Sequence, residues 1–503
     1  MKLAKLLAPL DDAVLVNFAD RSIRGLELDS RKVRPGTLFA VVPGSRCDGT
    51  RYVPDAIRRG AAAVLSATRT FVPDDVTLVL VPHVRRALAD LCCRFYGHPS
   101  HYVRTVGVTG TNGKTTVATL VRSLLAAAGR QAALLSTVVH QIGSRRLPAT
   151  NTTPEAPQLQ AFFADMVERH IGHAVMEVSS HALDQERARG VRFDVGVLTN
   201  LAPHEHLDYH GTFEAYRDAK AGLFEALAAQ ATAVLNADDP QVSFFAERTP
   251  AKVITYGLDR EADVRASVES IDLEGMTFRL ATPCGQARVR SPLIGRYNIQ
   301  NLLAGTASGI ALGIDLPTIA AGIERFHGAP GRLERVDAGQ PFTVLVDYAH
   351  NHGGLESVLR ALRPLTEGRL IVVFGAGGER DLSKRARMGA AAAQHAALTV
   401  LTADNSRSER TDDIIRAIAE GMPPDAPRLV EADRREAIRK ALGFARPGDL
   451  VLIAGKGHET YQELDGVRFP FDDREEARRA LLGLALRDAR RGARRSLSTT
   501  GIT

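Results

Sequence analysis

Hydrophobic and polar residues follow two patterns that alternate along most of the chain. Short runs rich in Val, Ile and Leu, such as residues 370–374, are typical of buried strands. Elsewhere apolar residues recur at intervals of three and four, as at Val117, Leu120, Val121 and Leu124, which is typical of a helix that packs by one face. Because alternating strands and helices usually form parallel sheets covered by helices, we predict an α/β protein with doubly wound sheets.

Three blocks of this pattern predict three domains. We expect a smaller N-terminal α/β domain at 1–101, a central domain with a P-loop-type sheet at 102–330, and a Rossmann-like C-terminal domain at 331–486. Strands are expected at 37–42, 76–81, 102–108, 173–178, 195–200, 233–236, 253–256, 344–347, 370–374, 398–402 and 450–453. Helices are expected at 54–59 and 84–96, and a β-rich insert at 276–290.

A glycine-rich segment joins the first strand of the central block to its first helix. It reads Gly107-Val-Thr-Gly-Thr-Asn-Gly-Lys-Thr-Thr116. Backbone N–H groups at such a helix start bind polyphosphate, while Lys114 and the Thr115 hydroxyl are suited to the outer phosphates and Mg²⁺. Val108 stands where the strict pattern has its first glycine. We predict an ATP site rather than an ordinary strand–helix turn, with contacts from Gly110, Thr111, Asn112, Gly113, Lys114, Thr115 and Thr116.

The composition is that of a globular protein and adds little to the predicted fold. The chain has 503 residues, of which 45% are hydrophobic and 24% charged, and a formal net charge of +6. It has no apolar run long enough to span a bilayer, so we expect no membrane insertion. The first ten residues only faintly resemble a signal peptide, because Asp11 and Asp12 follow them, and we expect a first helix there. The four cysteines have neither metal-site nor disulfide spacing, which suits a cytoplasmic protein.

The end of the chain is rich in arginine, with five of them at Arg487, Arg490, Arg491, Arg494 and Arg495. Such a cluster could bind nucleic acid, but we expect a solvated, frayed end and no nucleic-acid partner. The segment 487–503 is therefore interpreted as a flexible tail.

Candidate chemistry gathers in the central block. Glu177 lies at the carboxyl end of a predicted strand, where open α/β sheets place ligands, and a carboxylate there suits a hard cation. The alternative is a glutamate that caps a helix. The segment 199–211 holds three histidines and two carboxylates, which favours a metal or phosphate site over structural histidines. No His-Glu-x-x-His motif is present, so a zinc hydrolase is disfavoured.

Ten ordered motifs resemble those of the Mur ligase family, and they cover nearly the whole chain. They are Thr109–Thr116, Asn151-Thr-Thr-Pro154, Met176-Glu-Val-Ser-Ser-His181, His206-Leu-Asp-Tyr-His-Gly211, Ala219-Lys220, Asn236-Ala-Asp-Asp-Pro240, Asn298-Ile-Gln-Asn301, Pro330-Gly-Arg332, Asp347-Tyr-Ala-His350 and Gly455-Lys-Gly-His-Glu459. Two further motifs, Leu28-Asp-Ser-Arg31 and Asp48-Gly49, resemble the uridine-nucleotide-binding domain of the ligases that add the third residue of the peptidoglycan stem peptide.

The resemblance implies an ATP-dependent amide ligase of peptidoglycan synthesis that works through an acyl phosphate. The implied substrates are ATP, meso-diaminopimelate and UDP-N-acetylmuramoyl-L-alanyl-D-glutamate, and the implied cofactor is Mg²⁺, with two ions expected. The implied catalytic residues are Lys114, Glu177, His206 and Lys220. Metal ligands would be Thr115, Glu177, His206 and Lys220, the last as a carbamate formed with CO₂. Without the flanking motif, Lys220 would be interpreted as an exposed helix lysine beside Asp218.

The resemblance also implies three sets of contacts in a monomeric enzyme. Further ATP contacts would come from Asn236, Asn298, Asn301, Arg332, Asp347 and His350. The muramoyl substrate would contact Ser30, Thr152, Thr153, Ser179, Ser180 and Arg187. Diaminopimelate would contact Arg385, Asp404, Asn405, Arg407, Gly455 and Glu459.

The identity of the amine depends most on Arg407. It lies in Asp404-Asn-Ser-Arg-Ser-Glu409, which resembles the Asp-Asn-Pro-Arg-x-Glu signature of diaminopimelate-adding relatives. An arginine can hold the distal carboxylate of diaminopimelate in two parallel hydrogen bonds, and lysine lacks that carboxylate. Ser406 replaces the signature proline, which loosens the loop. Further departures are the extra residue His204, the segment 351–354 and the tail.

These departures leave two alternatives open. One is a paralogue that joins another amine, such as lysine or ornithine, or a different acid. The other is a nucleotide-binding regulator without activity, against which the retention of Lys114, Glu177, His206 and Lys220 argues.

Overall fold

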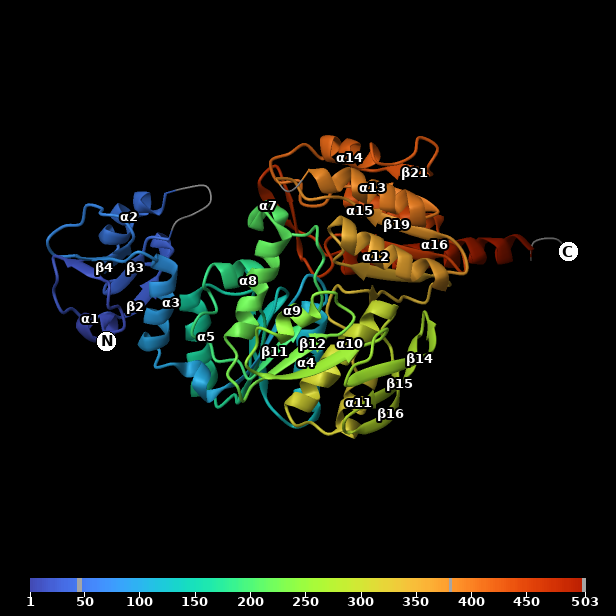
Figure 1. The fold of residues 1–503 in the computed structure, drawn as a ribbon. Coiled ribbons are helices and arrows are strands. Elements are labelled where there is room, and N and C mark those ends of the chain that lie inside the picture. Colours follow the sequence, from blue (N-terminus) through green and yellow to red (C-terminus); the bar gives the residue numbers. More distant parts are fainter. Residues whose placement is uncertain (43–47, 380–381, 500–503) are drawn as a thin grey trace. The chain divides into compact units, whose positions relative to one another are not determined.

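The computed structural model describes residues 1–42, 48–379 and 382–499, with the backbone alone for 487–499. The chain divides into two compact units, one made of residues 1–264 and 304–318 and the other of residues 265–303 and 319–503. Both units contain sheets with helices packed on them (Figure 1). The predicted α/β class is confirmed.

The N-terminal part of the first unit is a five-stranded sheet of order β1-β5-β4-β3-β2. Its elements are β1 (Val14–Val16), β2 (Gly25–Glu27), β3 (Thr37–Ala40), β4 (Ala61–Ser66), β5 (Thr77–Leu80), α1 (Leu3–Leu7), α2 (Val53–Arg58), α3 (Val84–Phe95) and 3-10 turns at Ser30–Lys32, Gly49–Tyr52 and Pro99–Tyr102. Successive side chains of β3 enter two cores: Leu38 packs with residues of α1 and α3, and Phe39 with residues of α2.

A second sheet of this unit has the strand order β13-β12-β11-β6-β10-β7-β8-β9. Its strands are β6 (Arg104–Thr109), β7 (Ala132–Leu135), β8 (Val139–Ile142), β9 (Arg145–Pro148), β10 (His173–Glu177), β11 (Val195–Leu198), β12 (Thr232–Asn236) and β13 (Lys252–Gly257). The strands from β13 to β7 are parallel, and β8 and β9 add antiparallel edges. The strand order reverses at β6, with β10 and β7 on one side of it and β11 and β12 on the other. The loop after β6 therefore lies at the switch point where open α/β sheets bind ligands.

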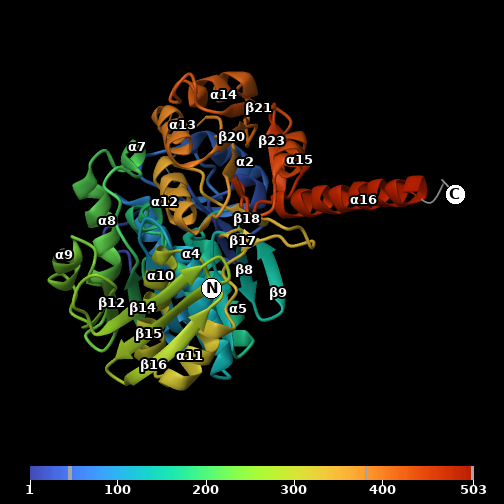
Figure 2. The same ribbon diagram turned by 90° about the vertical axis from the view of Figure 1, so that its right-hand side faces the viewer.

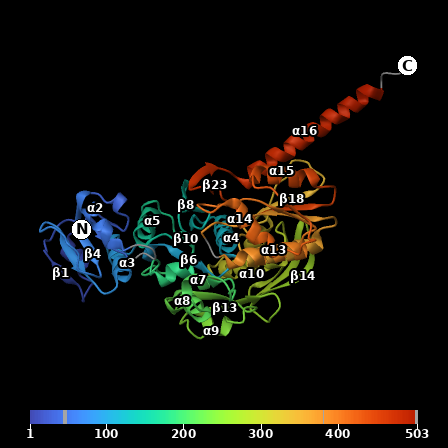
Figure 3. The same ribbon diagram turned by 90° about the horizontal axis from the view of Figure 1, so that it is seen from above.

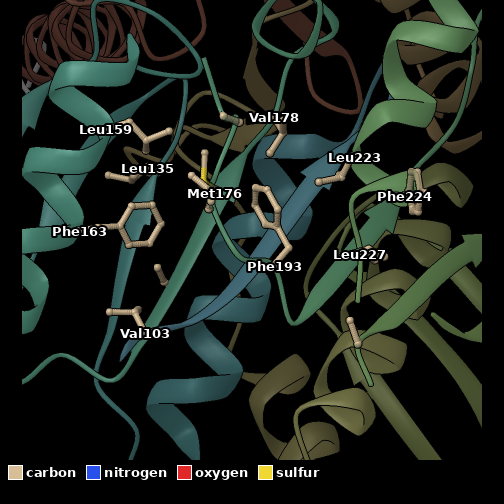
Figure 4. Close-up of a cluster of buried hydrophobic side chains, with 14 of the residues drawn as sticks. Val103, Leu135, Leu159, Phe163, Met176, Val178, Phe193, Leu223, Phe224 and Leu227 are labelled. Atoms are coloured by element: carbon tan, nitrogen blue, oxygen red, sulfur yellow. The ribbon is translucent and has the colours of Figure 1, made fainter. Parts of the chain in front are cut away.

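Helices cover this sheet on both faces. The helices of this region are α4 (Lys114–Ala127), α5 (Ala156–Glu168), α6 (Ser180–Asp184), α8 (Phe213–Glu225) and α9 (Val242–Ala246), and the short α7 (Leu207–His210) lies against α8 without a buried residue. Figure 4 shows how Phe163 of α5 and Leu223 of α8 meet Met176 of β10 in one buried cluster. Gly107 makes room for this core, since a Cβ there would lie 2.7 Å from the Phe193 ring.

The second unit begins with an antiparallel segment. Strands β14 (Val264–Asp272), β15 (Gly275–Thr282) and β16 (Gly285–Ser291) lie side by side (Figure 2). This confirms the predicted β-rich insert and adds β14 to it. Helices α10 (Arg296–Ala311) and α11 (Leu316–Glu324) follow, and the division between the two units runs through both.

The rest of the second unit is built on a six-stranded sheet of order β17-β18-β22-β19-β20-β21. Its strands are β17 (Glu334–Arg335), β18 (Thr343–Asp347), β19 (Leu370–Phe374), β20 (Leu398–Leu401), β21 (Arg428–Val430) and β22 (Leu450–Ala454), beside the hairpin β23 (Tyr461–Leu464) and β24 (Val467–Pro470). Its helices are α12 (His352–Leu362), α13 (Ser383–His395), α14 (Thr411–Ala419), α15 (Arg434–Phe444), α16 (Asp473–Thr499) and a 3-10 turn at Arg363–Leu365.

This sheet is buried on both faces, which explains its continuous hydrophobic strands. In β19, Leu370, Val372 and Phe374 pack with residues of α12, α13 and α14. The intervening Ile371 and Val373 pack with residues of α15 and α16. Strands expected from such apolar runs are therefore confirmed to within a few residues at their ends.

The described end of the chain is helical. The backbone of residues 473–499 is one helix, α16 (Figure 3), which extends into the segment expected to be frayed. The segment is rich in Ala, Leu and Arg, which are good helix formers. Flexibility of the tail stays a prediction.

In the described part of the chain Cys92, Cys93 and Cys284 are free, and Cys47 lies outside it. Within the same ranges, every helix is too short or too polar to cross a membrane.

The start of α16 is fixed by a buried ion pair. Arg434, at the start of α15, donates to both oxygens of Asp473 at 2.7 Å, and both side chains are fully buried. Breaking such a pair leaves one charge buried without its partner.

We therefore predict that Asp473→Asn destabilises the C-terminal domain by about 3–5 kcal/mol. Native-state hydrogen exchange of α15 and β22 amides would measure this loss. Exposed Glu475→Gln, two residues away, is the matched control and should change protection little. Unchanged exchange in Asp473→Asn would show that the pair contributes little to stability.

Candidate active site

The loop between β6 and α4 requires glycine at two positions. Gly110 has a φ of 139°, and a Cβ on it would lie 1.9 Å from the Thr199 hydroxyl oxygen. Gly113 has a φ of 86° and precedes the first residue of α4, Lys114. Both backbone conformations are unfavourable for other residues. The loop thus places its backbone at the N-terminus of α4, as a phosphate-binding loop does.

Residues after β11 hold this loop in place. The Thr111 N–H donates to the Asn200 carbonyl at 2.7 Å, and the Asn112 N–H donates to the Asn200 side chain at 3.0 Å. The Thr199 hydroxyl donates to the Asn112 carbonyl at 2.6 Å. On the other side, the Thr111 hydroxyl lies 2.8 Å from the Tyr216 hydroxyl of α8. Neither Asn200 nor Tyr216 was expected from the sequence to have a separate role.

Two lysines converge on one carbonyl of the loop. Lys114 Nζ donates to the carbonyls of Gly110 and Thr111, each at 2.9 Å. Lys220 Nζ, from α8, donates to the same Gly110 oxygen at 2.9 Å. Lys220 is only 1% exposed, so the alternative of an exposed helix lysine is wrong. Its aliphatic neighbours on α8 face the core, which carries Lys220 inward with them.

Burial changes the chemistry of Lys220. Desolvation, and then the positive charge of Lys114, lower the pKa of Lys220 well below that of an ordinary lysine. No carboxylate is recorded within ion-pair distance of its Nζ in the described part of the chain, and the Tyr216 ring centroid lies 4.7 Å away. The lowered pKa shifts Lys220 toward the neutral amine, which is a nucleophile.

Histidines and tyrosines pack around these lysines. The His206 ring centroid lies 5.3 Å from that of His181 and 5.6 Å from that of Tyr216, and His181 stacks on Tyr209 at 4.0 Å. Desolvation of its ring, and then the charges of Lys114 and Lys220, lower the pKa of His206, although the residue as a whole is exposed. Its imidazole is neutral near pH 7, the form that binds metal. The expected effect of the extra residue His204, which is exposed, stays a prediction.

Glu177 ends β10, and its backbone is paired with Val108 of β6, so it reaches the same sheet edge as the phosphate loop. Its fully buried carboxylate accepts from the Thr137 N–H at 2.8 Å and from the Thr137 hydroxyl at 2.9 Å. Ser179, not Glu177, caps α6. The capping alternative for Glu177 is therefore wrong. Thr137 was missed, although its place soon after parallel strand β7 was the available signal.

The residues expected to contact the muramoyl substrate lie around Glu177, with the exception of Ser30. Thr152 Oγ1 is 3.1 Å from the Thr137 hydroxyl, and the Thr153 hydroxyl donates to the Glu177 carbonyl at 2.9 Å. The Ser179 N–H donates to the Thr153 hydroxyl at 3.0 Å, and Ser180 is buried nearby at the start of α6. Ser30 lies in the N-terminal sheet region, where its side chain hydrogen-bonds Asp55.

Arg187 joins this group through three partners. Its guanidinium donates to the Thr153 carbonyl at 3.3 Å and to the Gln185 side chain at 2.6 Å, and its Nε lies 3.0 Å from a Glu155 oxygen. Gln185 in turn donates to the Tyr209 hydroxyl at 2.9 Å. Gln185 and Glu155, which the sequence analysis did not name, therefore fix the direction of Arg187.

In the second unit, a buried lysine organises the loop after β20. Lys456 is fully buried and donates to Asn405 at 2.9 Å and to Glu459 at 3.0 Å. Asn405 donates to the same Glu459 oxygen at 2.8 Å. Burial opposes ionisation of Asp404, but the charges of Lys456 and Arg434 lower its pKa below the usual value. Lys456 gave no separate signal in the sequence.

The two arginines expected at diaminopimelate differ in their partners. Arg407 has a φ of 53° and donates through its guanidinium to the Gly378 carbonyl. Arg385 pairs with Glu409 at 2.9 Å. At Gly455 a Cβ would lie 2.5 Å from an Asp404 oxygen, so glycine is required there. Arg380 and Asp381, in the motif before Arg385, lie outside the described residues.

The remaining residues expected at ATP are held by the protein itself. Asn236 donates to the Thr199 carbonyl at 2.8 Å, and Asn301 donates to Asn298 at 2.9 Å. Further contacts are the Leu333 N–H with Asp347 at 2.8 Å, the Arg332 guanidinium over the Tyr348 ring at 4.6 Å, and His350 Nδ1 with the Tyr348 carbonyl at 2.9 Å. Their contact with ATP stays a prediction. Asn351 caps α12 through the Gly354 N–H at 2.8 Å, so the departure at 351–354 still starts a helix.

The first unit offers an incomplete set of metal ligands. Across residues 1–42, 48–379 and 382–486, no three His, Cys, Asp or Glu side chains are arranged to hold a metal ion. Glu177 and His206 are hard or borderline donors, and Thr115 is buried at the start of α4. Lys220 offers an amine, which is not a ligand that Mg²⁺ prefers. A carboxylate on Lys220 would add an oxygen donor of the kind that Mg²⁺ prefers.

Three family models match consecutive parts of the chain. They are the Mur ligase family catalytic domain at residues 22–96, the Mur ligase middle domain at 108–309, and the Mur ligase glutamate ligase domain at 331–457. Each match falls within one of the three domains expected from the sequence.

Similar proteins match over nearly their whole length. The UDP-N-acetylmuramoyl-L-alanyl-D-glutamate--2,6-diaminopimelate ligase of Geobacillus kaustophilus is 44% identical over 488 residues, covering 96% of this chain and 99% of the relative. The ligase of the same name from Gloeobacter violaceus is 45% identical over 467 residues, covering 92% and 95%. A solved structure of a ligase of that name has a TM-score of 0.68 at 33% identity, covering 96% of this chain and all of that one. The chain, with its phosphate loop, buried Lys220 and three matched domains, therefore belongs to the Mur ligase family.

Proposed function

We propose that this protein is the ATP-dependent ligase that joins meso-diaminopimelate to UDP-N-acetylmuramoyl-L-alanyl-D-glutamate. The observation that carries the proposal is the convergence of Lys114 and buried Lys220 on the Gly110 carbonyl, at the sheet edge that Glu177 also reaches. It is supported by identity of 44% to a ligase of this name over 96% of the chain. The proposed site of action is the cytoplasm, where ATP is available.

The proposed reaction first activates a carboxylate, which is a poor acyl donor at neutral pH. A carboxylate oxygen of the muramoyl dipeptide attacks the γ-phosphorus of ATP, and ADP leaves as the acyl phosphate forms. The amine of diaminopimelate then attacks the acyl carbon, forms a tetrahedral intermediate, and expels phosphate as the amide forms and the amine loses a proton. Negative charge gathers in both steps, so nearby cations are the main requirement.

The phosphate loop provides the first part of this requirement. N–H groups at the start of α4 face the phosphates, and the ammonium of Lys114 can exchange its bonds to the carbonyls of Gly110 and Thr111 for phosphate oxygens. Bound Mg²⁺ would neutralise phosphate charge and polarise the transferred group. Thr115, Glu177 and His206 would hold it together with modified Lys220.

The state of Lys220 explains how the ligand set is completed. Its neutral amine attacks the carbon of CO₂, a C–N bond forms, and loss of a proton leaves a carbamate. The modification converts a basic group into a carboxylate, which suits a divalent ion. Burial favours the reacting form, because desolvation penalises the ammonium and shifts Lys220 toward the neutral amine.

The amine-binding role is assigned to the loop after β20. Arg407 would hold the distal carboxylate of diaminopimelate, and Asp404 and Glu459 would receive an ammonium group. Arg385 would assist by exchanging Glu409 for a substrate carboxylate. Thr152, Thr153, Ser179 and Arg187, grouped around Glu177, would hold the muramoyl dipeptide.

Phosphate release from ATP by purified protein tests the proposal. UDP-muramoyl dipeptide is supplied with diaminopimelate, lysine or ornithine in turn. The proposal requires release with diaminopimelate and formation of the tripeptide by mass spectrometry. A paralogue would prefer another amine or ignore the muramoyl dipeptide, and a regulator would release no phosphate.

We predict that Lys220→Ala lowers kcat by about 100-fold or more, because the metal site loses a carboxylate. A short carboxylic acid added to Lys220→Ala should restore part of this activity, since it can occupy the space of the carbamate. Exposed Lys252→Ala is the matched control and should retain wild-type activity. Failure of every acid to restore activity in folded Lys220→Ala protein would weigh against the carbamate.

A pH dependence follows from the lowered pKa of Lys220. Because the pKa of Lys220 is lowered, the carbamate should form at a lower pH than on an ordinary lysine, and it should be lost as the pH falls through that lowered pKa. NMR of protein equilibrated with ¹³C-bicarbonate should show a carbamate carbon that Lys220→Ala lacks. A signal that appears only near the pKa of an ordinary lysine would contradict this.

Removing Arg407 should weaken binding of the amine selectively. Arg407→Ala should raise the KM for diaminopimelate by about 30-fold or more, because a buried carboxylate would lose its charged partner. The KM for ATP should stay within about twofold of wild type. Arg410→Ala, which removes an exposed arginine of the same loop, is the control. Equal changes in both KM values would contradict a role at the substrate carboxylate.

A further inference from the structure

Arg407 adopts a backbone conformation that it would not adopt alone. Its φ of 53° lies in the left-handed region, which is unfavourable for a residue with a side chain and persists only where neighbours enforce it. Relaxation of this residue to a negative φ would redirect its guanidinium. The direction of that side chain therefore depends on what fixes the loop before and after it.

After Arg407, the hairpin of β23 and β24 fixes the backbone. The Arg407 N–H donates to the Glu463 carbonyl at 3.1 Å, and the Gly466 N–H donates to the Arg407 carbonyl at 3.2 Å. Before it, Asn405 is held by Lys456 and Glu459. Ser406 is the one residue between these two anchors, and the signature proline that would stiffen this point is replaced by serine.

The Ser406 side chain supplies an anchor of its own. Its hydroxyl lies 2.7 Å from the hydroxyl of Thr411, the first residue of α14, and Ser406 is only 2% exposed. Its carbonyl accepts from the Glu409 N–H at 3.0 Å, which closes a turn over Arg407. A Cβ on Gly378 would lie 2.0 Å from the same carbonyl, so the loop is tightly packed at Ser406.

We propose that Ser406 and Thr411 form a hydroxyl clamp that holds Arg407 in its left-handed conformation and so determines selection of an amine with a distal carboxylate. Ser406 and Thr411 are positioning residues, since they act through Arg407. The inference rests on the proposed function, because it concerns the amine of that reaction. A proline would restrict the φ of residue 406 itself, whereas here the hydroxyl pair ties residue 406 to the start of α14.

The size of the effect follows from the hydrogen bond. Removing one partner of a buried hydrogen bond leaves the other partner unsatisfied. The free-energy cost corresponds to about a tenfold change in the equilibrium between the held and the relaxed conformation of the loop. Ser406→Ala and Thr411→Val should each raise the KM for diaminopimelate about tenfold. The preference for diaminopimelate over lysine should fall by a similar factor, while the KM for ATP stays within about twofold. Thr411→Ser keeps the hydroxyl and should behave as wild type.

A double-mutant cycle with Arg407→Ala separates positioning from general stability. In the Arg407→Ala background, Ser406→Ala should change the KM for diaminopimelate by less than about twofold, because the group that the clamp positions is absent. Hydrogen exchange of α14 and the KM for ATP check that each variant is folded. An undiminished tenfold effect of Ser406→Ala without Arg407 would overturn the proposal.

Different results would overturn the hydroxyl clamp and the proposed function. A wild-type protein that ligates diaminopimelate while Ser406→Ala and Thr411→Val do so with unchanged KM and selectivity would overturn the clamp alone. A wild-type protein that does not ligate diaminopimelate would overturn the proposed function and the clamp with it.

Discussion

The site depends on one shared acceptor, the carbonyl of Gly110. Two lysines, one from the loop itself and one from α8, donate to that oxygen. Bringing a second amine into a buried place beside an ammonium costs free energy unless it gives up its proton, and the lowered pKa of Lys220 expresses this. The same placement that makes Lys220 costly as a cation makes it reactive as an amine. The metal chemistry we propose therefore begins with the packing of α8.

Much of the fold could be predicted from local sequence because its strands are apolar runs buried on both faces. Residues 370–374 show this most clearly, since each of the five positions enters one of two cores. The phosphate loop was equally predictable, because Gly110 and Gly113 have conformations that few other residues adopt. Helix α16 was harder, since its many charged residues resemble those of a solvated tail until their helix propensity is considered.

The candidate site could be predicted only where the residue type itself indicates the chemistry. Glu177, His206 and Lys220 were named in advance, but the burial of Lys220 was not, because its inward direction depends on how α8 packs. Thr137, Gln185 and Lys456 were missed since their importance lies in contacts with residues distant in the sequence. The hydrogen bond between Ser406 and Thr411 could not be predicted for the same reason. The sequence shows that serine replaces the signature proline, but not that its hydroxyl meets Thr411.

The ionic cluster around Lys456 has a further consequence for charge. Asp404 and Glu459 lie beside Lys456, and Asp473 pairs with Arg434, so carboxylates and cations alternate in a largely buried place. In the proposed reaction, Asp404 and Glu459 would receive an ammonium group of the bound amine. A diamino acid can supply it with one nitrogen protonated while its other nitrogen stays free to form a bond, and a monoamine would have to use its single nitrogen for both purposes.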